Sequence, residues 1–143
     1  MRPLLLLALF LFVAPAAASD ADALRKSGLL GTWAQDCAAP PGEDNWFDSY
    51  AIEKDGRVTE TLANAPDKTY RVYELHNVKI VSADRIAYAM MADSEMLDIV
   101  VQFEGKRQRS WSSRVQGGGK AYITDGKLVA GGSETIWFNK CAK

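Results

Sequence analysis

Glu74 and His76 are the side chains of this sequence with the clearest capacity for chemistry. They stand two residues apart in the run TYRVYELHNVKIV, residues 69–81, which is rich in aromatic and β-branched residues. Such a run predicts a strand, and its period of two places both side chains on one mainly apolar, inward face. An inward carboxylate and imidazole could bind a polar ligand group or form an acid–base pair. The alternatives are a β-bulge near Glu74 that flips the face, or a satisfied hydrogen-bonded pair near a rim.

His76 is the one histidine of the chain. Neither a Ser–His–Asp triad, nor a Cys–His pair, nor a metal centre can be assembled around it with any specificity. The acidic stretch CAAPPGEDNWFD, residues 37–48, contains Glu43, Asp44 and Asp48 but lacks the twelve-residue EF-hand pattern. We therefore expect a protein that is not an enzyme and that binds no metal or other cofactor.

Aromatic and other long side chains in further predicted strands could line a ligand pocket. Period two groups Trp46 with Tyr50, and Arg109 with Trp111, on common strand faces. The candidate ligand-binding residues are Trp46, Tyr50, Tyr70, Glu74, His76, Tyr88, Arg109 and Trp111. Such side chains either line an adaptable pocket or simply fill the interior of a small barrel.

The elements that must position these residues are short strands joined by tight turns. Asp-Gly and Glu-Gly pairs in residues 54–57, 104–107 and 124–127 are typical of hairpins. About nine or ten strand-like segments follow one another at short spacing, and helical character is confined to the lead DADALRKSG. Three strands have these predicted faces: Ile86, Tyr88 and Met90; Leu97, Ile99, Val101 and Phe103; and Arg107, Arg109, Trp111, Ser113 and Val115. This pattern predicts an all-β antiparallel up-and-down meander after a short helical lead.

The first eighteen residues predict export from the cytoplasm. Arg2, the apolar run of residues 4–13 and three small residues at 16–18 form a signal peptide with an A-x-A cleavage site before Ser19. The run falls short of the roughly 20 residues that span a bilayer. Residues 19–143 are then expected to form a single domain of the bacterial periplasm or a secreted protein, without membrane insertion.

The charge of the chain does not favour a nucleic-acid partner. Its 143 residues carry 17 basic and 18 acidic side chains, a formal net charge of −1. Basic residues cluster in GKRQR, residues 105–109, beside a predicted turn. Such a cluster is more typical of a solvated hairpin than of a nucleic-acid site.

The two cysteines lie near the two ends of the strand array. Cys37 follows the first predicted strand and Cys141 follows the last. An exported chain with two cysteines favours one disulfide. An antiparallel meander can remove its exposed edges by pairing its first strand with its last, and a Cys37–Cys141 disulfide would fix that seam.

Gly31, Thr32 and Trp33, which open the first strand after the helical lead, resemble the G-x-W motif of the lipocalin and calycin superfamily. The resemblance implies that Trp33 plugs the closed end of a barrel whose open end holds a small apolar ligand. Lipocalins also carry a helix after the barrel and a late arginine stacked over the tryptophan. The chain stops at Lys143 without such a helix, and no basic residue can be matched to that arginine. Its size is closer to that of small periplasmic barrels that inhibit lysozyme or proteases.

These features together predict a monomeric, non-enzymatic binding protein that takes a small apolar or amphipathic ligand into the barrel mouth. The alternative is an inhibitor or interaction module whose loops dock on a hydrolase or another envelope protein. Residues 37–48 are the candidate loop for this role, because Pro40, Pro41 and Gly42 suggest a rigid projecting turn. A rigid loop loses little entropy on docking.

Overall fold

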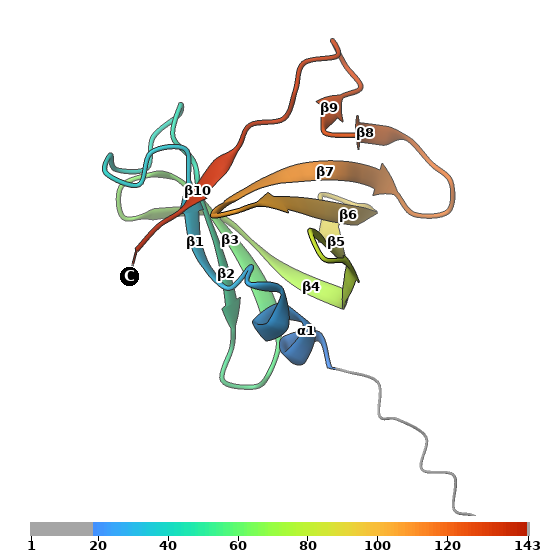
Figure 1. Cartoon of the computed structure of the whole chain (residues 1–143), viewed down its shortest axis with the longest axis horizontal. Helices are drawn as coiled ribbons and strands as arrows, with labels where there is room; N and C mark the ends of the chain where they lie inside the picture. Colours follow the sequence, from blue (N-terminus) through green and yellow to red (C-terminus); the bar gives the residue numbers. More distant parts are fainter. Residues whose placement is uncertain (1–18, 143) are drawn as a thin grey trace, which may run out of the picture.

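The structure is a computed structural model that describes residues 19–142. The predicted signal peptide, residues 1–18, lies outside the described residues. One short helix, α1 (Asp20–Ser27), precedes the strands (Figure 1). The strands are β1 (Gly31–Ala34), β2 (Phe47–Ile52), β3 (Val58–Ala65), β4 (Lys68–Ser82), β5 (Arg85–Ala92), β6 (Glu95–Glu104), β7 (Arg107–Val115), β8 (Ala121–Thr124), β9 (Lys127–Leu128) and β10 (Phe138–Lys140).

Strands β1 to β7 are joined as consecutive antiparallel neighbours, and β10 closes the ring by pairing with both β1 and β7. The result is the predicted all-β, up-and-down barrel, with eight strands in the closed ring. Strand β8 pairs with the far half of β7, and β9 pairs with β8, so these two strands lie outside the ring (Figure 1). Closure leaves the first and last strands of the ring without free edges.

The predicted hairpins form at all three turn sequences, with different backbone geometry. Asp125 and Gly126 have φ values of 51° and 71°, the positive pair that a type I′ turn needs. In the turns at residues 54–57 and 104–107, positive φ is confined to Gly56 and Gly105.

Helix α1 and β1 both contribute buried side chains to the core of the barrel. The α1 side chain of Leu24 and the following Leu29 are fully buried, and Trp33 is only 1% exposed. The Trp33 indole Nε1 donates a hydrogen bond of 2.8 Å to the Leu29 carbonyl oxygen. Trp33 is therefore buried, and its role as the plug stays a prediction. Lys140 Nζ lies 5.1 Å from the centre of its ring, so β10 supplies a basic residue over the tryptophan that the sequence did not reveal.

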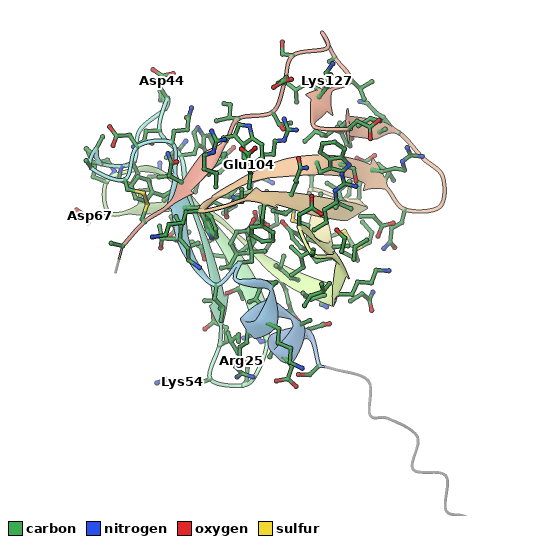
Figure 2. All side chains as sticks on the ribbon, in the orientation of Figure 1. Arg25, Asp44, Lys54, Asp67, Glu104 and Lys127 are labelled. Atoms are coloured by element: carbon green, nitrogen blue, oxygen red, sulfur yellow. A yellow bond between two sulfur atoms is a disulfide. The ribbon has the colours of Figure 1, made fainter. Side chains whose placement is uncertain are left out.

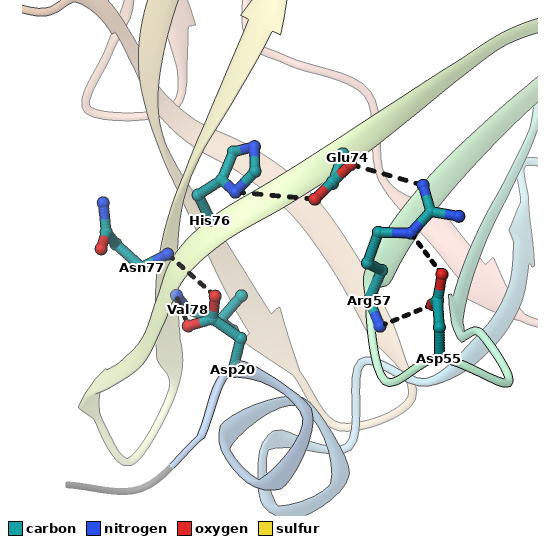
Figure 3. A network of polar contacts seen from close by, with 7 residues as sticks. All are labelled: Asp20, Asp55, Arg57, Glu74, His76, Asn77 and Val78. Atoms are coloured by element: carbon teal, nitrogen blue, oxygen red, sulfur yellow. Dashed lines mark hydrogen bonds and ion pairs between the residues drawn. The ribbon is translucent and has the colours of Figure 1, made fainter.

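Helix α1 is fixed to the barrel wall at its first residue. Ser19 caps the helix by accepting from the Asp22 backbone N–H, and Gly28 ends it with a left-handed backbone. The Asp20 carboxylate accepts from the backbone N–H groups of Asn77 and Val78 in β4, at 3.2 and 2.8 Å (Figure 3).

No helix among the described residues is long and apolar enough to cross a membrane.

The two ends of the chain meet at the seam of the barrel. Trp33 of β1 pairs with Lys140, and Phe138 pairs with Gln108 of β7. A disulfide joins Cys37 and Cys141, which follow β1 and β10. The predicted disulfide is thus confirmed, and it fastens the strands that close the ring.

Candidate functional site

Glu74 and His76 lie on the outside of the barrel, so the prediction that they face inward is wrong. In β4 the residue between them, Leu75, is the buried one, at 2% exposure, whereas Tyr70 and Val72 are 48% and 59% exposed. A bulge in the β4–β5 pairing lies after them, between His76 and Lys79, and it places the buried Val78 on the opposite face from Glu74 and His76. The bulge shifts the face by one residue, as the sequence alternative allowed.

The outward pair belongs to a chain of exposed charges (Figure 3). His76 Nδ1 lies 3.9 Å from Glu74 Oε1, and Arg57 donates to Glu74 Oε2 at 3.4 Å. Arg57 also donates to the Asp55 carboxylate at 2.7 Å. Water and salt screen exposed ion pairs of this kind, so they add little to stability, and the chain of charges is a solvated face of the barrel.

Arg109 and Trp111 also face outward. Val100 pairs with Ser112 and Val101 pairs with Ser110, so a bulge at Trp111 interrupts the alternation of β7. The residues of β7 that are buried are Gln108 and Ser113. The predicted face of Arg107, Arg109, Trp111, Ser113 and Val115 is therefore split between the two sides of the sheet.

On the outer face these residues build a ladder of alternating arginine and tryptophan side chains. Arg85 lies 4.2 Å from the Trp111 ring centre, and Arg109 lies 5.3 Å from it on the next step. Arg109 is also 4.6 Å from the ring centre of Trp137, which Arg107 approaches at 4.9 Å. Through Trp137 these cation–π contacts join the part of the chain before β10 to β7, and through Trp111 they join β7 to Arg85 of β5.

Trp46 and Tyr70 meet at the base of the loop formed by residues 35–46. Their ring centres are 5.1 Å apart in an edge-to-face arrangement, and Trp46 Nε1 donates to the Glu43 carbonyl oxygen at 2.9 Å. They are brought together, but not in the interior with the other predicted aromatics.

Tyr50 and Tyr88 do lie in the barrel interior, where they meet three polar side chains. Tyr50 Oη donates to Asp48 Oδ2 at 2.8 Å and lies 3.1 Å from Glu60 Oε1. Tyr88 Oη lies 3.3 Å from Tyr50 Oη and 3.4 Å from Glu60 Oε2. Gln108 Nε2 donates to Asp48 Oδ2 at 3.3 Å. We call Asp48, Tyr50, Glu60, Tyr88 and Gln108 the interior polar cluster.

The interior polar cluster combines two carboxyl groups without a cationic partner. Asp48 and Glu60 are 7% and 6% exposed, and neither forms an ion pair within the described residues. Burial raises the pKa of the Asp48 carboxyl well above its usual range, and the charge of Glu60 adds to the rise. Burial also raises the pKa of Glu60, against the lowering effect of its hydrogen bonds. Asp48 Oδ1 is buried and accepts no hydrogen bond.

Two members of the interior polar cluster were missed by the sequence analysis. Glu60 lies two residues after the buried Val58 in β3, on the same face of the strand. Period two could therefore have placed Glu60 inside. Gln108 could not be found this way, because the bulge at Trp111 obscures the alternation of β7. Asp48 was considered in the sequence as one carboxylate of the acidic stretch 37–48, whereas the structure places it in β2.

The loop of residues 35–46 is organised around one asparagine. Asn45 Oδ1 accepts from the Asp36 backbone N–H at 3.0 Å. Asn45 Nδ2 lies within 3.3 Å of the carbonyl oxygens of Asp36, Ala39 and Pro40. Backbone bonds between Gly42 and Asn45 and the disulfide of Cys37 complete the loop. It projects from the barrel with Asp44 at its tip (Figure 2).

One hollow of the described residues has a volume of about 780 Å³ and is lined by residues of β4, β5 and β6 together with Asp20. Tyr88 is the one member of the interior polar cluster that lines it, and the exposed Lys79 and Asp98 form part of its wall. Among residues 19–142, no three His, Cys, Asp or Glu side chains are grouped so that they could hold a metal ion.

Comparisons with protein-family models, with curated proteins and with solved structures find no significant match. The closed antiparallel barrel with its helical lead agrees in architecture with the lipocalin-like resemblance of Gly31, Thr32 and Trp33. At the level of family, the likeness remains a resemblance.

Proposed function

We propose that this chain is an exported, non-enzymatic interaction module that docks on a basic surface of another protein of the cell envelope through the loop of residues 35–46. The observation that carries the proposal is the rigid, projecting form of this loop. The disulfide of Cys37 and the hydrogen bonds of Asn45 hold it in one conformation. A preformed loop loses little conformational entropy when it binds.

The charge of the loop supports a basic partner. Asp36, Glu43 and Asp44 lie within residues 35–46, which contain no lysine or arginine. Asp67, in the turn between β3 and β4, projects on the same side of the molecule (Figure 2). Carboxylates grouped on one side attract a basic surface over a distance and raise the rate of association.

The barrel interior favours docking over a ligand in the barrel mouth. Tyr50 and Tyr88, the candidate ligand residues that face inward, are buried, and their hydroxyl groups donate hydrogen bonds to Asp48 and Glu60. The hollow of about 780 Å³ is lined by only one candidate ligand residue, Tyr88, and its wall includes the exposed Lys79, Val81 and Asp98. The small-ligand function stays a prediction, which native mass spectrometry of gently purified protein would test through a bound molecule.

The docking function is tested by inhibition and binding assays with two basic probes, a lysozyme and a trypsin-type protease. We expect the wild-type chain to bind or inhibit at least one of them, with affinity that falls as salt concentration rises. Combining Glu43→Gln with Asp44→Asn should weaken binding about tenfold or more, mainly through slower association.

A matched control removes two exposed carboxylates away from this loop, one in α1 and one in the turn between β2 and β3, by combining Asp22→Asn with Asp55→Asn. This variant should bind as the wild type does. Equal affinities for the loop variant and the control would refute docking through residues 35–46, and a small molecule bound in stoichiometric amount would favour the ligand function instead.

A further inference from the structure

The interior polar cluster contains more oxygen–oxygen contacts than its phenols can bridge. Tyr50 Oη approaches Asp48 Oδ2, Glu60 Oε1 and Tyr88 Oη, and Tyr88 Oη also approaches Glu60 Oε2, all within 3.4 Å. Each phenol supplies a single hydrogen, and an ionised carboxylate supplies none. With both carboxyl groups ionised, two hydrogens would serve four contacts. The remaining contacts would then bring lone pairs together.

The Asp48 carboxyl oxygen that accepts no hydrogen bond also indicates that a carboxyl group in the cluster is neutral. Asp48 Oδ1 is buried and accepts no hydrogen bond, while both donors near this carboxyl group, Tyr50 and Gln108, reach Oδ2. A buried carboxylate with an unsolvated oxygen is strongly disfavoured unless a proton or a cation neutralises it.

Within residues 19–142, no cationic side chain forms an ion pair with Asp48 or Glu60. The groups that face Asp48 and Glu60 are Tyr50 from β2, Tyr88 from β5 and Gln108 from β7. Among the described residues, every ion pair involves other carboxylates. Two bare charges this close in a buried site would repel each other, so one of them is expected to be neutral.

We propose that the barrel core is a proton-binding site, in which Asp48 and Glu60 hold at least one proton between them at neutral pH. The carboxyl hydrogens supply the contacts that the phenols cannot. The site is independent of the docking loop, because its residues lie inside the ring of strands.

The proton makes the stability of the barrel depend on pH in an unusual direction. In the unfolded chain both carboxyl groups titrate near pH 4, at about 3.9 and 4.3. Burial raises both pKa values in the folded state. Above about pH 4 the folded state therefore retains protons that the unfolded state has released, and the stability conferred by the site falls as pH rises through the folded pKa values. The folding equilibrium constant should fall about tenfold per pH unit for each retained proton.

Urea unfolding between about pH 4 and pH 9 measures this slope. In the wild type, we expect the folding equilibrium constant to decrease with rising pH. Asp48→Asn and Glu60→Gln keep the shape of a neutral acid but cannot titrate. Each should therefore make the dependence of the folding equilibrium constant on pH less steep, by up to the tenfold per pH unit that one retained proton causes. The matched controls Asp98→Asn and Glu104→Gln remove exposed carboxylates and should leave the slope unchanged.

Carbon-13 NMR titration of the side-chain carboxyl carbons tests the site in the wild-type protein, even if the interior variants do not fold. We expect the Asp48 or Glu60 carbon to remain in its protonated form at neutral pH. Titration of both carbons near pH 4 would overturn the proposal. A metal ion bound in stoichiometric amount in the native mass spectrum would overturn it too, because a cation would then take the place of the proton.

Discussion

At the scale of single residues, the barrel has a buried tryptophan and a polar centre. Trp33 has one polar atom, Nε1, and its bond to the Leu29 carbonyl oxygen satisfies it. The ring also packs against Phe103, with ring centres 6.0 Å apart. Asp48 in the centre retains an unsatisfied oxygen. Trp33 is thus a stabilising residue, whereas in the interior polar cluster a bound proton changes the free energy of unfolding.

Replacing Trp33 tests the plug. Trp33→Ala should lower the free energy of unfolding by about 3–5 kcal/mol, because it leaves a cavity and an unsatisfied carbonyl at Leu29. Urea denaturation at constant pH measures this loss. Trp111→Ala, on the outer ladder, is the matched control and should cost less because that ring is half-buried. A loss below about 1 kcal/mol for Trp33→Ala would show that another residue closes this end.

At the scale of elements, regular strands were predictable from the sequence and bulged strands were not. In β5 and β6 the predicted faces are correct: Ile86, Tyr88, Ile99 and Val101 are all buried. Both strands alternate without interruption along their shared register. Period two depends on such regularity, so it placed Tyr88 inside correctly.

Strands β4 and β7 show why the rest of the candidate site could not be predicted. Each carries a bulge in its pairing, one between His76 and Lys79 and one at Trp111. One additional residue exchanges the two faces, so Glu74, His76, Arg109 and Trp111 were assigned to the wrong side. A bulge depends on contacts from other elements, such as that of Asp20 with β4, which local alternation does not encode.

Asn77 is the residue through which the β4 bulge can be tested. Its φ is 54°, in the left-handed region, and its backbone N–H donates to Asp20. Glycine adopts this conformation freely and asparagine tolerates it, whereas alanine is strained there. Asn77→Ala should therefore lower the free energy of unfolding by about 1 kcal/mol, and Asn77→Gly should lower it less. Both are measured by urea denaturation.

Lys79→Ala, an exposed change just past the same bulge, is the control and should leave stability nearly unchanged. Equal stabilities of Asn77→Ala and Asn77→Gly would contradict the left-handed backbone at Asn77.

At the scale of the whole molecule, the barrel is closed by a short seam. Strand β10 forms two residue pairs with β1 and two with β7, whereas β5 and β6 share eight. The disulfide of Cys37 and Cys141 lies beside this seam and joins residues separated by 104 positions. The disulfide thus lies where the ring has few residue pairs. Because Cys37 belongs to the loop of residues 35–46, the same bond also holds this loop next to the seam.

Removing the disulfide should therefore weaken the whole barrel and open the seam first. The combined change Cys37→Ser and Cys141→Ser should lower the free energy of unfolding by about 4–5 kcal/mol, the chain-entropy value for a loop of about 100 residues. In native-state hydrogen exchange, the backbone N–H groups of Lys140 and Cys141, which donate to Lys106 and Thr32, should lose protection before those of β5 and β6. A uniform loss of protection in all strands would instead mean that the disulfide stabilises the barrel only through the unfolded chain. Early loss at β10 alone would show that the disulfide also holds the ring closed in the folded state, and with it the loop that we propose docks on a partner.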